Sequence, residues 1–257
     1  MLTAFLDNMD RYLFGVKPGV TIQGEDVGRL LPEEVRTCVE HLAIRYQKVP
    51  SEPGLDKKTG NIIPEVNGCI ISLEDNVEQI MSAQEGEKLQ LKVISVYPKH
   101  TRYDIEEAKN IIGTYETWAS GSEGRRNNIN LAANAINNTL IWPDEVFSFN
   151  NVVGPRSMAR GYLPAPIIMM GHTELDPGGG VCQVSSTLFN AAERAGVEII
   201  ERHQHSKPVR YVPIGKDATV SYGNLDLRFK NTLKGPIIIK AGMSGSKIWV
   251  NILGREK

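Results

Sequence analysis

The chain has 257 residues, of which 41% are hydrophobic and 23% are charged, a composition typical of one large globular domain or two of ordinary size. Its formal net charge of −1 at pH 7 argues against a nucleic-acid partner, because phosphate binding draws on a surplus of lysine and arginine. No apolar run approaches the roughly 20 residues that a membrane-spanning helix needs.

The N-terminal segment, residues 1–15, is apolar but interrupted. Asp7, Asp10 and Arg11 break its hydrophobic stretch and no small-residue cleavage site follows, so it makes a poor secretory signal. The sequence therefore predicts either a protein that stays inside the cell or an export segment that lies outside this chain.

The first hundred residues follow the order helix, hairpin, helix, strand, which predicts a small α+β unit. A helix is predicted at Leu31–Tyr46, and another after Ser72, whose hydroxyl can cap it. The pair Asn67-Gly68 predicts a hairpin turn. The remaining predicted elements are a turn at Lys57–Gly60 and strands at Ile62–Val66, Cys69–Ile71 and Leu89–Val96. Nothing here gathers reactive side chains, so residues 1–100 are interpreted as a spacer or binding module.

Residues 101–257 alternate helical and strand patterns and end in a series of strands. Helices are predicted at Tyr103–Ile112, at Asn128–Thr139 and from Cys182 to a stop at Gly196. Strands are predicted at Thr114–Ala119, Val146–Phe149, Ile167–Met170, Val197–Glu201, Ala218–Tyr222, Leu225–Phe229, Pro236–Lys240 and Lys247–Ile252. Turn residues between the last strands predict an antiparallel sheet, so the fold class is α+β.

The three cysteines, Cys38, Cys69 and Cys182, form no close pairs, so neither a zinc site nor a disulfide framework is indicated. A Cys38–Cys69 disulfide is conceivable, but nothing in the sequence supports it. Cys38 shares a helical face with Val35 and Val39, which predicts that it packs in a core.

In the run Gly178-Gly179-Gly180-Val181-Cys182, three residues without side chains come directly before a helical pattern whose first residues include a thiol. The first amides of a helix are unpaired donors, and the helix dipole adds positive charge, which favours thiolate. Glycine backbone also lets a substrate come close. The pattern predicts a nucleophilic cysteine; the alternative is an inert cysteine that serves as a small core hydrophobe.

Two histidines, His203 and His205, follow the next predicted strand, an arrangement that papain-like hydrolases use. Strand alternation sends both side chains to one face, so spacing cannot choose the general base. Asp217 or Asp226 could orient the imidazole, with a turn or hairpin-edge role as the alternative for each.

Further candidates complete the site. The amides of Cys182 and Gln183, directly after Gly180, are candidate oxyanion donors. Three arginines are candidate ligands for substrate carboxylates, because a guanidinium grips a carboxylate with two hydrogen bonds; surface ion pairing is the alternative. They are Arg125, Arg156 and Arg202. The histidines lack a third ligand at a recognisable spacing and the glycine run lacks a phosphate-loop lysine, so no metal and no cofactor is predicted.

Separated motifs in the second unit form one ordered set: Arg125–Ile129, Trp142–Asn150, Gly154–Arg156, Arg160–Tyr162, Gly178–Leu188, Glu201–Ser206 and Gly215–Val220, with Asp226 and Asn231. Together they resemble the VanW family, with a match that runs from about Thr114 to at least Asn231. The N-terminal unit is similar, more weakly, to the peptidoglycan-binding modules that commonly precede VanW domains. The resemblance implies a Cys-bearing helix packed on a mainly antiparallel sheet.

The resemblance implies cell-wall work. Family members have been assigned L,D-transpeptidase activity that depends on the cysteine of a Gly-Gly-Val-Cys-Gln motif, here Cys182, acting on peptidoglycan stem tetrapeptides through a thioester. The family pattern favours His205, followed by Ser206, over His203 as the base. It also implies a location outside the membrane, facing the wall, reached through a signal or anchor that this chain lacks. The alternatives are a non-catalytic wall-binding or scaffold protein and a stem-peptide hydrolase.

Overall fold

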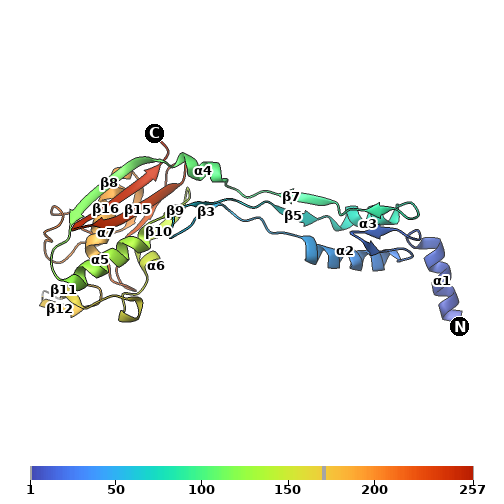
Figure 1. The fold of residues 1–257 in the computed structure, drawn as a ribbon, viewed down its shortest axis with the longest axis horizontal. Helices are drawn as coiled ribbons and strands as arrows, with labels where there is room; N and C mark the ends of the chain where they lie inside the picture. The colour runs from blue at the N-terminus through green and yellow to red at the C-terminus, as the bar shows by residue number, and fades with distance from the viewer. Residues whose placement is uncertain (1, 170–171, 257) are drawn as a thin grey trace. The chain divides into compact units, whose positions relative to one another are not determined.

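The computed structural model describes residues 2–169 and 172–256, and it combines helices with mostly antiparallel strands, which confirms the α+β class (Figure 1). The chain forms two compact units: Met1–Glu52 with Pro64–Thr101, and Pro53–Ile63 with Arg102–Lys257. The segment 53–63 thus belongs to the second unit, whereas the sequence placed a single boundary at residue 100.

The first unit holds a small core between two packed helices and a short sheet. α2 (Pro32–Tyr46) begins after Leu31, and α3 (Leu73–Met81) begins after Ser72, whose Oγ accepts a hydrogen bond from Asp75 N at 3.4 Å, as predicted. Cys38 packs against this core, also as predicted. The remaining elements are α1 (Leu2–Phe14) and a sheet of order β2-β1-β6 from β1 (Thr21–Ile22), β2 (Glu25–Asp26) and β6 (Lys88–Leu89).

The hairpin predicted around Asn67-Gly68 is wrong. β5 (Gly68–Ile71) pairs with β7 (Val93–Val96), and β4 (Ile62–Ile63) pairs with β3 (Gly54–Leu55) around the predicted turn at residues 57–60. A Cβ on Gly68 would lie 2.4 Å from the carbonyl oxygen of Lys48. Gly68 therefore permits the close approach of a neighbouring segment, and does not turn the chain.

The second unit is built on an antiparallel sheet of order β8-β16-β15-β9. Its strands are β8 (Asn110–Trp118), β9 (Thr139–Ile141), β15 (Ile237–Ser244) and β16 (Lys247–Gly254). The helix predicted at Tyr103–Ile112 is shorter, because α4 spans only Arg102–Glu107 and Ile111 already pairs with Leu253 across the sheet. Pairing with β16 has outweighed the local helical pattern.

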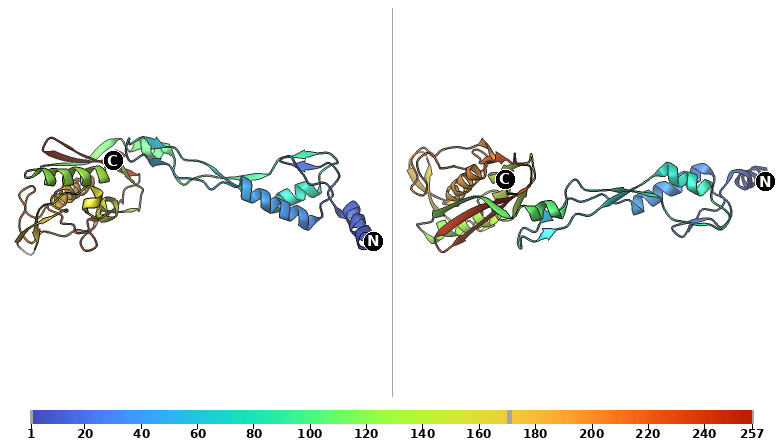
Figure 2. Two further views of the ribbon diagram at one scale, coloured as in Figure 1. Left: turned by 60° about the horizontal axis from the view of Figure 1, so that its bottom comes forward. Right: turned by 90° about the horizontal axis from the view of Figure 1, so that it is seen from above.

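One face of this sheet carries the core. Alternate residues of β16, such as Ile248, Val250 and Ile252, are fully buried on it. α7 (Val181–Ala195) packs on β8 and β16, and α5 (Glu123–Ile136) packs on β15, as Figures 1 and 2 show. This arrangement confirms the predicted packing of a Cys-bearing helix on an antiparallel sheet.

Part of the opposite face is covered by α4 and the β3–β4 hairpin. Ile105 and Ala108 form a small cluster there with Ile238. Lys57 Nζ, in the hairpin turn, donates to the carbonyl oxygen of Asn137 at 2.6 Å, and burial lowers its pKa to about 8. These contacts explain why residues 53–63 join the second unit.

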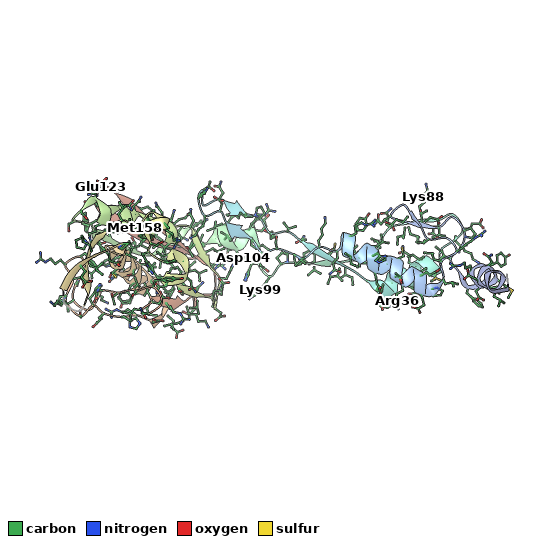
Figure 3. All side chains as sticks on the ribbon, turned by 90° about the horizontal axis from the view of Figure 1, so that it is seen from below. Arg36, Lys88, Lys99, Asp104, Glu123 and Met158 are labelled. Carbon is green, nitrogen blue, oxygen red and sulfur yellow. The ribbon has the colours of Figure 1, made fainter. Side chains whose placement is uncertain are left out.

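α7 is the central helix of this unit. Twelve of its 15 residues are buried, which requires cover on several sides. A second sheet of order β10-β14-β13 supplies part of that cover, from β10 (Val146–Ser148), β13 (Glu198–Glu201) and β14 (Arg228–Lys230), and α6 (Phe149–Val153) follows β10. Figure 3 shows side chains throughout the unit, with exposed Met158 of a short 3-10 helix, Met158–Arg160, among those labelled.

The strands predicted at Ala218–Tyr222 and Leu225–Phe229 are largely absent from the described structure. Only the isolated bridges His203–Thr219 and Ser221–Leu225 form there, and β14 begins at Arg228. The reason lies in α7, since Ser185 Oγ donates to the carbonyl oxygen of Ala218 at 2.6 Å and Ser186 Oγ accepts from its amide at 2.9 Å. Side chains of a helix thus take the place of a neighbouring strand.

Among the described residues, no helix combines the length and apolar character that crossing a bilayer requires. The predicted strand Ile167–Met170 is observed as β11 (Ala165–Met169), which pairs with β12 (His172–Asp176), while Met170 lies outside the described residues.

Candidate active site

The start of α7 is shaped by Asp176 and the glycines that follow it. Asp176 Oδ1 accepts from Gly178 N at 2.6 Å, and its carbonyl oxygen accepts from Gly179 N at 3.1 Å. A Cβ on Gly179 would lie 2.5 Å from the carbonyl oxygen of Ala165, and Gly180 has a φ of +103°. Side chains are therefore excluded at both positions, and the backbone enters the helix directly before Cys182.

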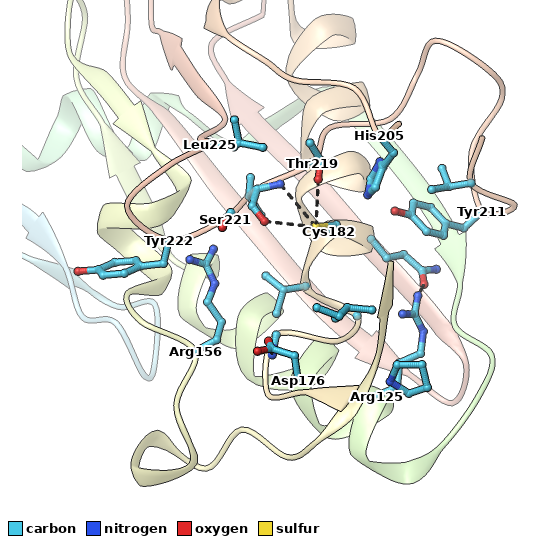
Figure 4. Close-up of a pocket in the computed structure, with 18 residues that line it drawn as sticks. Arg125, Arg156, Asp176, Cys182, His205, Tyr211, Thr219, Ser221, Tyr222 and Leu225 are labelled. Carbon is cyan, nitrogen blue, oxygen red and sulfur yellow. Dashed lines mark hydrogen bonds between the residues drawn. The ribbon is translucent and has the colours of Figure 1, made fainter. Parts of the chain in front are cut away.

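The thiol of Cys182 is partly buried against the segment 219–220. Its Sγ donates to the carbonyl oxygen of Val220 at 3.4 Å and accepts from Val220 N at 3.5 Å, and Thr219 Oγ1 lies 3.6 Å away (Figure 4). Donor groups that face the sulfur from Val220 and Thr219 can stabilise a thiolate.

His205 and Asp217 complete a chain of interactions with this thiol. Asp217 Oδ2 lies 2.6 Å from His205 Nδ1 and accepts from the His205 amide at 2.7 Å. The imidazole lines the same cavity as the thiol of Cys182 and lowers the pKa of that thiol, and Figure 4 shows both side chains at this cavity. The imidazole is therefore held by Asp217 beside the thiol, which is the arrangement of a nucleophile, a base and an orienting carboxylate.

The pKa shifts of these groups are opposite in sign. Burial raises the pKa of Cys182, but hydrogen bonds from His205, Val220 and Thr219 and the charge of the imidazole outweigh it, so the pKa falls below its ordinary 9.0. Burial lowers the pKa of His205, but its hydrogen bonds to Cys182 and Asp217 and their charges raise it above 6.5. Both shifts favour the charged forms, thiolate and imidazolium, relative to the isolated side chains.

Asp217 is held by its surroundings on the other side as well. Burial raises its pKa, but the hydrogen bonds from the amide and imidazole of His205 outweigh this and hold the pKa below 3.8. Arg202 donates to the carbonyl oxygens of Asp217 and Gly215 at 2.7 and 2.8 Å, and Nη2 lies 3.4 Å from Asp217 Oδ1. Arg202 therefore supports the carboxylate from behind.

His203 and Asp226, the alternative candidates, lie elsewhere. His203 Nε2 is 2.9 Å from Glu201 Oε1. Asp226 accepts from Ser148 Oγ at 2.5 Å and from Asn150 N at 2.9 Å, and it lines a second cavity with Glu201. The structure thus brings His205 and Asp217 to the thiol and separates His203 and Asp226 from it.

Of the two predicted oxyanion donors, one amide already donates a hydrogen bond within the protein. The Gln183 amide donates to the carbonyl oxygen of Gly180 at 3.0 Å, within the first turn of α7. The amide of Cys182 itself, at the second position of the helix, remains the candidate donor.

A cavity of about 540 Å³ opens at Cys182 and His205. Two of the three candidate arginines line it, Arg125 and Arg156, whereas Arg202 is not among its lining residues. Arg125 Nη2 donates to Gln183 Oε1 at 2.8 Å. Arg125 thus bonds a neutral side chain of α7, whereas Arg156 Nη1 and Nη2 make no hydrogen bond among the described residues.

Several residues of the site carry no signal that sequence reasoning could use. Thr219 and Val220 lie within the motif Gly215–Val220, but their contact with the thiol of Cys182 depends on how that segment folds back over α7. Tyr211 lines the cavity and its ring lies edge-on to His205, with centroids 6.5 Å apart; burial raises its pKa. A tyrosine six residues after a histidine has no recognisable spacing, so only the fold reveals it.

No group of three or more histidine, cysteine or acidic side chains within residues 2–169 and 172–256 is arranged to hold a metal ion. The cysteines at 38, 69 and 182 are free thiols in the same described ranges.

The chain is an α+β protein with a candidate nucleophilic cysteine, because Cys182 lies at the start of the buried helix α7 and is accompanied by His205 and Asp217. A family model described as VanW like protein matches residues 124–253. The chain belongs to this family.

Two relatives accompany this match. The chain is 40% identical over 220 residues to a protein of Bacillus subtilis described as uncharacterized protein YoaR, covering 82% of this chain and 72% of the relative. It is 34% identical over 109 residues to the vancomycin B-type resistance protein VanW of Enterococcus faecalis, covering 40% of each chain. No solved structure matches the chain.

Proposed function

We propose that this protein is a cysteine-dependent L,D-transpeptidase that cross-links peptidoglycan stem peptides. Membership of the VanW family suggests a protein related to the cell wall or to glycopeptide resistance. The observation that carries the proposal is the chain of interactions from Asp217 through His205 to Cys182, in which Asp217 Oδ2 lies 2.6 Å from His205 Nδ1 and His205 and Cys182 line one cavity. Such a chain supports acyl transfer, because it supplies an ionised nucleophile and a group that exchanges protons.

The first half-reaction forms an acyl-enzyme. The Cys182 thiolate attacks the carbonyl carbon of the third residue of a donor tetrapeptide, and the carbonyl electrons move onto oxygen near the Cys182 amide. The imidazolium of His205 gives its proton to the nitrogen of the terminal D-alanine as the C–N bond breaks. D-alanine leaves as the free amino acid, and a thioester joins the peptide to Cys182.

The second half-reaction returns the enzyme to its starting state. A side-chain amine of a neighbouring stem attacks the thioester carbon, and neutral His205 accepts the proton that the amine loses. The C–S bond breaks, the new amide is the cross-link, and the thiolate and imidazolium are restored. Asp217 holds one tautomer and stabilises the imidazolium in both halves.

The substrate sets the proposed location, outside the membrane and facing the wall. The N-terminal unit would then act as a spacer or wall-binding module. The family model covers residues 124–253, so this role rests on the weaker resemblance of that unit alone.

The test is intact-mass spectrometry after incubation with a stem tetrapeptide or a carbapenem. The expected result is an adduct on the unmodified chain that is absent from Cys182→Ala and forms more slowly in His205→Ala. A Cys38→Ala variant is the matched control, because burial raises the pKa of Cys38 and it lies in the first unit; it should label like the unmodified chain.

Other outcomes identify the alternatives. An absence of adduct across the pH range contradicts the enzyme and favours a wall-binding scaffold with an inert Cys182. An adduct that turns over without an acceptor amine, releasing a tripeptide, identifies a hydrolase in place of a transpeptidase. Product analysis with and without an acceptor stem separates these two.

A further inference from the structure

Arg156 is a buried charge without a hydrogen-bond partner. Its two terminal nitrogens, Nη1 and Nη2, are buried and make no hydrogen bond to any residue that the structure describes. Burial lowers the pKa of this guanidinium. A buried charged group is normally paired, because its desolvation is otherwise uncompensated. Arg156 is therefore an exception that calls for a ligand.

The two aromatic rings beside Arg156 differ in their exposure. The guanidinium carbon lies 5.6 Å from the ring centre of Phe149 and 5.9 Å from that of Tyr222. Phe149 is fully buried, whereas Tyr222 is 53% exposed and lines the cavity. Because Nη1 and Nη2 are themselves buried, a ligand in the cavity would reach them by displacing the exposed ring of Tyr222.

The acidic side chain that acts on Arg156 is occupied elsewhere. Asp226 exerts an electrostatic effect on Arg156, but its oxygens accept hydrogen bonds from Ser148 Oγ and from the amides of Asn150 and Leu227. The structure therefore supplies no carboxylate of its own to the guanidinium among these groups.

Arg156 shares the cavity of the candidate nucleophile. It lines the same cavity of about 540 Å³ as Cys182, and in Figure 4 Arg156 and His205 lie on opposite sides of the cysteine. The sulfur and the guanidinium also interact electrostatically. A substrate bound for attack by Cys182 thus presents part of its length to Arg156.

We propose that Arg156 binds the terminal carboxylate of the donor peptide, so that Cys182 attacks the carbonyl one residue before a free C-terminus. This inference rests on the proposed function. A planar guanidinium grips a carboxylate with two parallel hydrogen bonds, and one residue spans only about 3.5 Å. Arg156 would therefore restrict the enzyme to peptide ends and exclude carbonyls in the middle of a chain.

The test compares two donor tetrapeptides that differ only at the C-terminus, one a free acid and one an amide. For the unmodified chain, acyl-enzyme formation at Cys182 should be faster with the acid. Arg156→Gln should lower the acid-to-amide rate ratio by about 10- to 100-fold, the size expected for a lost charge-assisted hydrogen bond. The loss should fall on the acid substrate and leave the amide rate nearly unchanged.

Two further variants test whether the effect comes from the guanidinium of Arg156. Arg156→Lys keeps the charge but cannot form two parallel hydrogen bonds with a carboxylate, so its acid-to-amide rate ratio should lie between those of the unmodified chain and Arg156→Gln. If Arg156→Gln fails to fold, Arg156→Lys takes its place in the test. Arg126→Gln is the charge-matched control, because Arg126 donates to the carbonyl oxygen of Gly245 at 2.8 Å and is not among the residues that line the cavity. Its ratio should equal that of the unmodified chain.

Peptide binding separates this inference from the proposed function. Calorimetry with Cys182→Ala measures affinity without chemistry, and the acid should bind more tightly than the amide unless Arg156 is also replaced. If no acyl-enzyme forms but this preference holds, the transpeptidase proposal fails and the carboxylate site stands. If Cys182 is acylated equally by acid and amide, or if Arg156→Gln keeps the preference, the carboxylate site is overturned.

Discussion

Replacing Asp217 with asparagine should raise the pKa of the Cys182 thiol. The carboxylate accepts two hydrogen bonds from His205, at 2.6 and 2.7 Å, and its side chain is only 10% exposed. Asparagine keeps the shape but removes the charge that stabilises the imidazolium. Less imidazolium means less stabilisation of the thiolate, so the two pKa values should move toward their ordinary 6.5 and 9.0.

The expected size follows from the hydrogen bonds that lose their charge. A hydrogen bond to a charged group contributes about 1.5–3 kcal/mol, and one pKa unit corresponds to about 1.4 kcal/mol. The pKa of His205 should therefore fall by about 1–2 units. The thiolate–imidazolium pair requires a pH above the pKa of the thiol and below that of the imidazole, so the pH range in which both groups are charged should shrink from both ends.

The assay is the rate of alkylation by iodoacetamide as a function of pH, with peptide mapping to separate Cys182 from Cys38 and Cys69. The midpoint for Cys182 should rise by about 1 unit in Asp217→Asn, the order given by one lost charged interaction. Asp226→Asn is the matched control, because Asp226 bonds Ser148 and Asn150 instead. An unmoved midpoint in Asp217→Asn, or an equal rise in both variants, refutes the reasoning.

The remaining predictions concern the packing that positions α7. Gly113→Ala should destabilise the fold by about 1–3 kcal/mol or more, because the new Cβ would lie 2.2 Å from the carbonyl oxygen of Ala191. Chemical denaturation measures this loss. The control is Glu116→Ala, on the exposed face of β8, which should change the free energy of unfolding little. Ser186→Ala should cost about 1–3 kcal/mol, since it leaves the buried amide of Ala218 unpaired; a loss no greater than that of exposed Ser246→Ala would contradict this account.

Local chemistry explains which parts of the fold could be predicted from the sequence. The start of α3 follows from the Ser72 cap and the end of α7 from Gly196, whose φ is +80°. These signals lie within a few residues of the feature that they predict. The same holds for the glycines before Cys182, where the absence of side chains indicates a close approach of backbone.

Strand partners could not be predicted in the same way, because they depend on segments far apart in sequence. Asn67-Gly68 has the composition of a turn, yet Gly68 serves contact with Lys48. The segment after Asp217 has strand-like alternation, yet its backbone groups bond serines of α7. In both places a distant segment decides the role of the residue.

The candidate site shows the same limit. The sequence could nominate Cys182 and two histidines, but alternation placed both histidines on one face. The choice between them follows from Asp217, which lies 12 residues beyond His205 and reaches its ring only after the chain folds back. Arg202 illustrates the converse, since a candidate for substrate binding instead supports Asp217.

The stability of α7 and the geometry of the candidate site depend on the same hydrogen bonds. A buried helix with serine, threonine and asparagine side chains needs partners for them, and the segment 216–220 provides several: Ser185, Ser186 and Asn190 all bond its backbone. That segment also carries Asp217, Thr219 and Val220 to His205 and Cys182. The polar side chains of α7 thus hold the segment 216–220, whose groups favour the thiolate of Cys182 in the first turn of the same helix. A substitution that loosens this segment should therefore lower both the free energy of unfolding and the reactivity of the thiol.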